Sequence, residues 1–223
     1  MPIITILDYD DTLLCSSYLS QKGIVFSTLF TSDVDSISKD ISELSEYLIP
    51  FLSFLMEQGT VYIVTNAEYG WAETTLEKIM PKIFNLIKGK ILIISARTKY
   101  QDIYPNDYVK WKKETMRDII NTDTSYNIPL YINDYFTTNC QKINNSSYRC
   151  LVSIGDSITE RYAILQLHEE KTDIIIKSIK LNENPSLSQL CAEINFLTTF
   201  LPKIYKSPCQ EDLMTVITKK DNI

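Results

Sequence analysis

The sequence predicts an α/β protein in which helices flank a central parallel β-sheet. Apolar runs rich in β-branched residues stand at 3–7, 60–66 and 150–157, and such runs are typical of strands that are buried on both faces. Each run ends in polar residues, at the edge where open α/β sheets bind their ligands. The sequence therefore predicts a ligand site at the carboxyl ends of these strands.

The segment between the first two strands is predicted to hold a flap and one helix. Gly23, between two short apolar pieces, indicates a β-hairpin flap at about 17–26, followed by a loop. Apolar residues at helical spacing predict a helix at 41–57 that stops at Gly59. A kink or a break is expected at Pro50, inside this helix. The segment is too short for a full folded cap domain.

The rest of the chain is predicted to continue the alternation of helices and strands. The expected elements are a helix at 71–88 that Pro81 interrupts, a strand at 90–95, a loop at 97–106, a helix at 107–121, an edge strand at 173–181 and a helix at 186–205. The Asn-, Thr- and Tyr-rich stretch at 122–147 indicates a loop-rich insertion. We expect one domain over 1–205 and a polar, loose C-terminal tail over 206–223.

Length, charge and cysteine usage limit the function classes. With 223 residues the chain can form one large core without a second domain. A formal net charge of -6 argues against a nucleic-acid partner. Five cysteines without a Cys-x-x-Cys pair favour reduced thiols in a cytosolic setting over a disulfide frame or a zinc site. We expect neither a signal peptide nor a transmembrane segment.

Two carboxylates, Asp8 and Asp10, follow the first strand directly. In extended backbone they point to the same side, because side chains alternate with a period of two. Converging carboxylates repel each other, so a cation or a shared proton must hold them together. A calcium loop of the EF-hand type fits worse, because Leu13 stands where that loop needs Gly and Leu19 where it needs Glu. An Asp-rich turn is the alternative without a catalytic role.

The stretch Asp8-Tyr9-Asp10-Asp11-Thr12 resembles motif I of the haloacid dehalogenase (HAD) superfamily, whose pattern is Asp-x-Asp-x-Thr. The resemblance covers about residues 1–165 and implies a HAD-like Rossmannoid parallel sheet, flanked by helices and without a large cap domain. It also implies that Asp8 is a nucleophile that forms an aspartyl-phosphate, a known use of a carboxylate, and that Asp10 is the general acid and base.

Motifs II and III of the family have counterparts further along the chain. The second strand ends in Thr65, which resembles the Thr or Ser of motif II, whose hydroxyl hydrogen-bonds a phosphoryl oxygen. Motif III is a Lys near the start of a helix, where it stabilises the charge around the nucleophile and the phosphate. Lys112 is the favoured residue, and Lys110 and Lys99 stay open as alternatives.

The fourth predicted strand ends in Gly155-Asp156, with Glu160 shortly after, and this resembles motif IV. The resemblance implies a Mg²⁺ ion bound by Asp8, by the backbone carbonyl of Asp10 and by Asp156, oxygen ligands of the kind that Mg²⁺ prefers. Glu160 stands where the family often has Asp. It is expected to act through water or to orient Lys112, rather than to bind the metal directly. A plain strand-to-helix turn is the alternative.

The motifs occur in the order of the family and together imply a Mg²⁺-dependent phosphomonoester phosphatase. Without a large cap the site is expected to be open, which suits a bulky substrate such as a phosphoprotein. Some capless family members act on protein phosphotyrosine, including enzymes that intracellular bacteria deliver to host cells. The alternatives are a binding module that has lost turnover and a phosphatase or phosphotransferase for small metabolites. The expected location is the cytoplasm, or a host cell in the case of such delivery.

Overall fold

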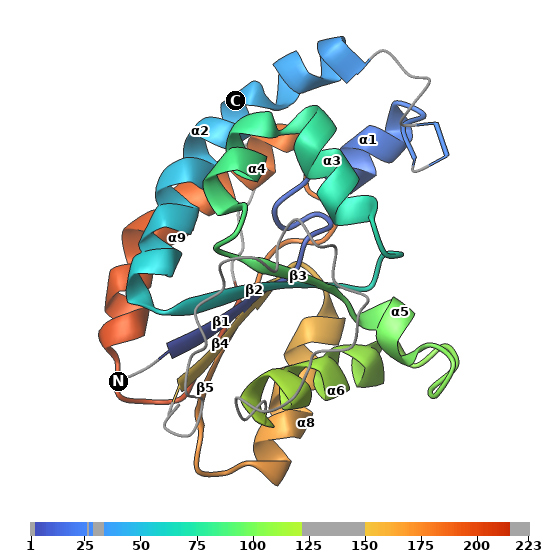
Figure 1. Cartoon of the computed structure of the whole chain (residues 1–223). Coiled ribbons are helices and arrows are strands. Elements are labelled where there is room, and N and C mark those ends of the chain that lie inside the picture. The colour runs from blue at the N-terminus through green and yellow to red at the C-terminus, as the bar shows by residue number, and fades with distance from the viewer. Residues whose placement is uncertain (1–2, 26, 29–33, 122–149, 215–223) are drawn as a thin grey trace, which may run out of the picture.

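A six-stranded, all-parallel β-sheet forms the centre of the molecule, in the order β3-β2-β1-β4-β5-β6 (Figure 1). The computed structural model describes residues 3–25, 27–28, 34–121 and 150–214. The strands are β1 (Ile3–Leu7), β2 (Thr60–Thr65), β3 (Leu92–Ser95), β4 (Cys150–Gly155), β5 (Ile175–Lys180) and β6 (Glu211–Met214). The predicted α/β class and parallel sheet are thus confirmed, and the architecture is Rossmann-like.

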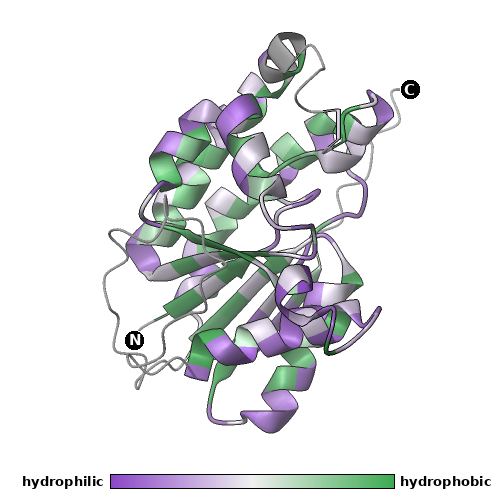
Figure 2. Cartoon of the chain, turned by 45° about the vertical axis from the view of Figure 1, so that its right-hand side comes forward, coloured by the Kyte–Doolittle hydropathy of each residue, from purple (hydrophilic) through white to green (hydrophobic). Residues whose placement is uncertain are grey.

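Helices cover both faces of the sheet. One face carries α1 (Ser16–Gln21), α2 (Val34–Gln58), α3 (Trp71–Ile79), α4 (Pro81–Ile87) and α9 (Leu187–Lys206), and the other carries α5 (Ala96–Tyr100), α6 (Tyr108–Asn121) and α8 (Ile158–Glu170) (Figure 1). Figure 2 shows hydrophobic residues along the strands and a mixture of both kinds on the helices. This three-layer arrangement buries both faces of the sheet, as the continuous apolar runs predict.

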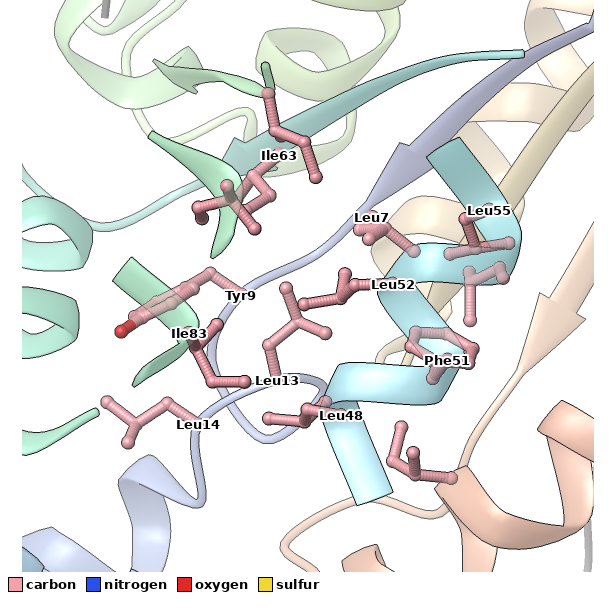
Figure 3. Close-up of a cluster of buried hydrophobic side chains, with 14 of the residues drawn as sticks. Leu7, Tyr9, Leu13, Leu14, Leu48, Phe51, Leu52, Leu55, Ile63 and Ile83 are labelled. Atoms are coloured by element: carbon pink, nitrogen blue, oxygen red, sulfur yellow. The ribbon is translucent and has the colours of Figure 1, made fainter. Parts of the chain in front are cut away.

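The packing around β1 decides where its terminal carboxylates point. Leu7 and Tyr9 are fully buried, and they lie in the core cluster that α2 closes with Leu48, Phe51 and Leu52 (Figure 3). The intervening residues Asp8 and Asp10 alternate with them and are therefore directed away from this cluster. The apolar positions of the strand end thus fix the direction of its polar ones.

The predicted hairpin flap is wrong, because residues 16–21 form helix α1. The carboxylate of Asp11 accepts hydrogen bonds from the backbone N–H of Ser17, at 2.9 Å, and from its hydroxyl, and so caps the first turn. Gly23 follows the helix with φ of 75°, a conformation that favours glycine. The apolar residues that suggested a hairpin serve the core instead, since Leu19 and Ile24 are buried.

Two further expectations about helices need correction. Helix α2 begins at Val34, earlier than predicted, and continues through Pro50 without a break. Its buried apolar stripe outweighs the backbone hydrogen bond that a proline removes. The predicted loop at 97–106 begins with helix α5, whose first turn is capped by the side chain of Ser95. The interruption at Pro81 is confirmed, because α3 ends at Ile79 and α4 begins at the proline.

The C-terminal end of the sheet also differs from the prediction. Strand β5 is not an edge strand, because β6 pairs with it in parallel register, from Lys177 with Glu211 to Lys180 with Met214. Part of the expected loose tail therefore belongs to the sheet. The predicted insertion at 122–147 and the tail beyond Met214 lie outside the described residues. Within the described ranges, no helix is long and apolar enough to cross a membrane.

Candidate active site

The polar residues predicted from the strand ends meet at one edge of the sheet. Asp8 and Asp10 follow β1, Thr65 ends β2, and Asp156 follows β4. Because β1 lies between β2 and β4, and all three run in parallel, their carboxyl ends are neighbours. Lys112 reaches the same place from α6 on one face of the sheet.

Lys112 forms the centre of a buried ion-pair network. Its ammonium group donates to the carboxylate of Asp8 and to the backbone carbonyl of Val64, and it lies 3.0 Å from Oε1 of Glu160. The Lys112 side chain is only 1% exposed. Burial alone would lower the pKa of Lys112, but the charges of Asp8 and Glu160 raise it. Lys112 is therefore a permanently charged contact of Asp8.

Three carboxyl groups gather beside this lysine, which pairs with two of them, Asp8 and Glu160. Single oxygen atoms of Asp8, Asp156 and Glu160 all lie within 4.8 Å of one another, and all three residues are buried. Burial, together with the neighbouring carboxylates, raises the pKa of Asp8 to about 7 and that of Asp156 to about 9. Lys112 pairs with two of these carboxyl groups and Lys180 reaches only the backbone carbonyl of Asp156, so the charge of the Asp156 side chain is left for a proton or a further cation to balance. Carboxylate oxygens at this spacing suit a hard divalent cation such as Mg²⁺.

Asp10 has a separate set of partners. Its Oδ1 accepts from the indole N–H of Trp71 at 2.7 Å, and its Oδ2 accepts from the hydroxyl of Thr65 at 3.1 Å. Burial raises the pKa of Asp10 above its ordinary value, although hydrogen bonds from Trp71, Thr65 and Ser16 lower it. The Asp10 side chain is not part of the acidic cluster, so a metal contact of this residue depends on its backbone carbonyl, as predicted from the resemblance.

Glu160 acts in the helix cap and in the ion-pair network at once. Its Oε2 accepts from the backbone N–H of Ser157 at 3.1 Å and closes the capping box of α8, while Oε1 faces Lys112. A Cβ atom on Gly155 would lie 2.7 Å from Cγ of Glu160. Position 155 thus requires glycine because Glu160 approaches its backbone closely. This reason is separate from the strand-to-helix turn that the sequence suggested.

Two residues around Asp156 were not assigned a role from the sequence. The hydroxyl of Thr12 accepts from the backbone N–H of Asp156 at 3.0 Å and lies 3.5 Å from its carboxylate. Lys180, at the end of β5, donates to the backbone carbonyl of Asp156. The motif itself contains Thr12 and could have indicated it. No motif in the sequence points to Lys180, because its contact with Asp156 depends on the pairing of β5 with β4.

Of the three candidate lysines, the structure brings only Lys112 to Asp8. Lys110 lies over the ring of Tyr104, with Nζ 4.3 Å from its centroid. Lys99 is paired with Asp118. Trp71 was also missed, since the sequence marked it only as the start of a helix. Its contact with Asp10 follows from the left-handed turn at Gly70, with φ of 86°, which starts α3 at the end of β2.

No family model matches this chain, and no curated protein or solved structure is significantly similar to it.

Proposed function

We propose that the chain is a Mg²⁺-dependent phosphomonoester phosphatase of the HAD type. The observation that carries the proposal is the buried contact of Lys112 with Asp8, beside the carboxyl groups of Asp156 and Glu160. A structural salt bridge would need one acid for one lysine, whereas the third acid, Asp156, favours a bound cation beside the pair. Asp8, Asp10, Thr65 and Asp156 lie at the edge of the sheet where ligands bind in this architecture.

In the proposed first step, a carboxylate oxygen of Asp8 attacks phosphorus and the bond to the ester oxygen breaks. Asp10 donates its proton to that leaving oxygen, and the raised pKa of Asp10 favours the protonated form that this role needs. The products of the step are a free alcohol and an aspartyl-phosphate on Asp8. Lys112 and Thr65 would hold the phosphoryl oxygens with the donors that contact Asp8 and Asp10 in the free protein.

In the second step Asp10, now a carboxylate, accepts a proton from a water molecule that attacks the phosphorus of the intermediate. The bond between phosphorus and the Asp8 oxygen breaks, which releases inorganic phosphate and restores the carboxylate. The residues that would hold Mg²⁺ are Asp8 and Asp156, with the backbone carbonyl of Asp10. When bound, the ion supplies positive charge that polarises the phosphoryl group. Glu160 keeps Lys112 in place.

The test is hydrolysis of a generic aryl phosphate with Mg²⁺ by the wild type and by Asp8→Asn, which is nearly isosteric. We expect turnover by the wild type, loss of turnover on addition of a chelator, and no turnover by the folded Asp8→Asn variant. Circular dichroism serves as the folding control for the variant. A folded wild type that binds Mg²⁺ and hydrolyses no phosphate monoester would overturn the proposal and favour a binding module.

A further inference from the structure

A pocket of about 370 Å³ lies beside the proposed catalytic residues. Its walls come from α1 and the turn after it, from the loop between β2 and α3, and from α5. The residues used below are Ser16, Ser20, Ala67, Glu68, Trp71 and Arg97. A volume of this size lies in the range of sites for small organic ligands.

Two residues that line the pocket hydrogen-bond Asp10 and its partner Thr65. Trp71, one of its walls, donates its indole N–H to Asp10 at 2.7 Å. Ala67, another wall, donates its backbone N–H to Thr65 at 2.9 Å, and Thr65 in turn donates to Asp10. In the proposed mechanism, Asp10 protonates the oxygen that joins phosphorus to the organic group. That organic group would therefore extend into this pocket.

The wall contributed by α1 is held in a fixed place. Asp11, with φ of 52°, accepts from both the backbone N–H and the hydroxyl of Ser17, and this hydroxyl lies 3.0 Å from Oδ1 of Asn184. The contact ties α1 to the end of β1 and to the loop between β5 and α9. A wall anchored on two sides is suited to a ligand of defined shape.

The side chains of the pocket offer three kinds of contact. Trp71 contributes an aromatic ring to the lining, and Ser20 on α1 contributes a hydroxyl group. Arg97 and Glu68 form an ion pair of 3.4 Å whose side chains are 40% and 66% exposed. Such an exposed pair is weak, so Arg97 and Glu68 can each give up this contact and bind a ligand instead. Together they offer donors and acceptors on the same wall.

We propose that this pocket binds the nucleoside part of a nucleoside monophosphate. A nucleobase has a flat ring to stack on Trp71 and an edge with both acceptors and donors to meet Arg97 and Glu68. Its sugar carries hydroxyl groups that suit Ser20 on α1. A tyrosine ring has no such edge, so a phosphotyrosine peptide would leave the charged pair unused. This inference rests on the proposed phosphatase activity.

The first experiment compares kcat/KM, with Mg²⁺, for guanosine and uridine monophosphates, ribose 5-phosphate, a phosphotyrosine peptide and acetyl phosphate. Ribose 5-phosphate shares the sugar and lacks the base, so it isolates the contribution of the pocket. From base stacking alone we expect the better nucleotide to exceed ribose 5-phosphate by about 10-fold or more in kcat/KM. Equal values, or preference for the peptide, would overturn the inference.

The second experiment blocks the pocket from its exposed side with Ser20→Trp. Gln21→Trp is the matched control, because Gln21 is the exposed neighbour on the same helix and does not line the pocket. We expect Ser20→Trp to raise KM for the nucleotide at least about 10-fold more than KM for acetyl phosphate. The control should match the wild type with both substrates. A nucleotide KM unaffected by Ser20→Trp would overturn the inference.

The two proposals fail in different ways. If ribose 5-phosphate is hydrolysed as efficiently as the nucleotides, the phosphatase stands and the nucleoside pocket falls. If the folded protein hydrolyses none of the substrates with Mg²⁺, the phosphatase proposal falls, and the inference that rests on it falls as well.

Discussion

At the scale of single residues, Lys112 is the most constrained group of the site. It is almost fully buried and contacts two acidic side chains. It also donates to the backbone carbonyl of Val64, near the carboxyl end of β2. Removal of one partner from a buried ion pair leaves uncompensated charge, which is costlier than loss of an exposed pair. Lys112 should therefore matter for folding as well as for phosphate binding.

The variant Lys112→Met is expected to lower the free energy of unfolding by about 3–5 kcal/mol in the absence of Mg²⁺. Lys110→Met is the matched control on the same helix, because the Lys110 ammonium lies over the Tyr104 ring, 4.3 Å from its centroid. The control should change the free energy of unfolding by about 1 kcal/mol or less. Urea unfolding measures both variants. Equal effects of the two would contradict the assigned importance of the Lys112 network.

The acidic cluster should make the metal-free protein sensitive to pH. The pKa of Asp156 rises on folding from 3.8 to about 9, so folding favours its protonated form. The stabilisation is complete below the unfolded pKa and is lost as pH rises through the folded pKa. From pH 5 to pH 9, metal-free wild type should lose stability relative to Asp156→Asn, which carries no charge at any pH.

Thermal unfolding in a chelator, measured for both proteins across this range, tests the expectation. Mg²⁺ should restore the wild type more at pH 9 than at pH 5, because the ion binds carboxylates and not carboxylic acids. Asp156→Asn should gain little from the ion. A constant difference between the two proteins over the whole range would mean that Asp156 is not protonated on folding.

The sequence indicated the acids of the site better than their partners. Asp8, Asp10 and Asp156 follow apolar runs that predict strands. The carboxyl ends of parallel strands all lie at the same edge of a sheet, so it could be predicted that these acids meet. Trp71 could not be predicted as a partner of Asp10, because its direction depends on the turn at Gly70. Local pattern places a residue on an element, whereas such contacts depend on how elements pack.

At the scale of elements, the errors at α1 and at β6 have one cause. Helix α1 has only six residues, and strand β6 has only four, with alternating partial exposure. Elements this short carry too few apolar residues for a periodic pattern, so tertiary contacts decide their conformation. The Asp11 carboxylate starts α1, and the buried Lys177 holds the approach to β6. Neither contact is visible from the neighbouring sequence.

Lys177 connects the end of α9 to the segment before β6. Its ammonium group donates to the backbone carbonyls of Ile204, Ser207 and Cys209, at 2.6, 2.8 and 3.2 Å. We expect Lys177→Met to cost about 1.5–3 kcal/mol of unfolding free energy, the usual contribution of a hydrogen bond to a charged group. Amide exchange should accelerate in β6 and stay unchanged in β1.

Lys206→Met is the control for this variant, because Lys206 is an exposed residue at the end of α9. It should leave exchange in β6 at the wild-type rate. If Lys177→Met leaves β6 as protected as in the wild type, the strand is held by its pairing with β5 alone.

At the scale of the whole molecule, one arrangement explains both the fold and the proposed chemistry. The parallel order places β1 in the middle of the sheet, and α2 closes the core beneath its end, so the acids of β1 face the edge (Figures 1 and 3). The order of the predicted motifs already implied this arrangement. The wall beside Asp10 was not implied, because it is built from the short helix α1 where a hairpin was expected.

The central claim is that Asp8 becomes phosphorylated and that Asp10 completes the reaction. The most direct measurement is intact-protein and tandem mass spectrometry of Asp10→Asn after incubation with Mg²⁺ and an aryl phosphate, whose leaving group needs little protonation. Without Asp10 to activate water, release of the phosphoryl group should slow by about 10²–10⁴-fold. We expect one phosphoryl group to accumulate, located on Asp8 and absent from the double variant with Asp8→Asn. A phosphoryl group on another residue, or turnover that survives Asp8→Asn, would contradict the account.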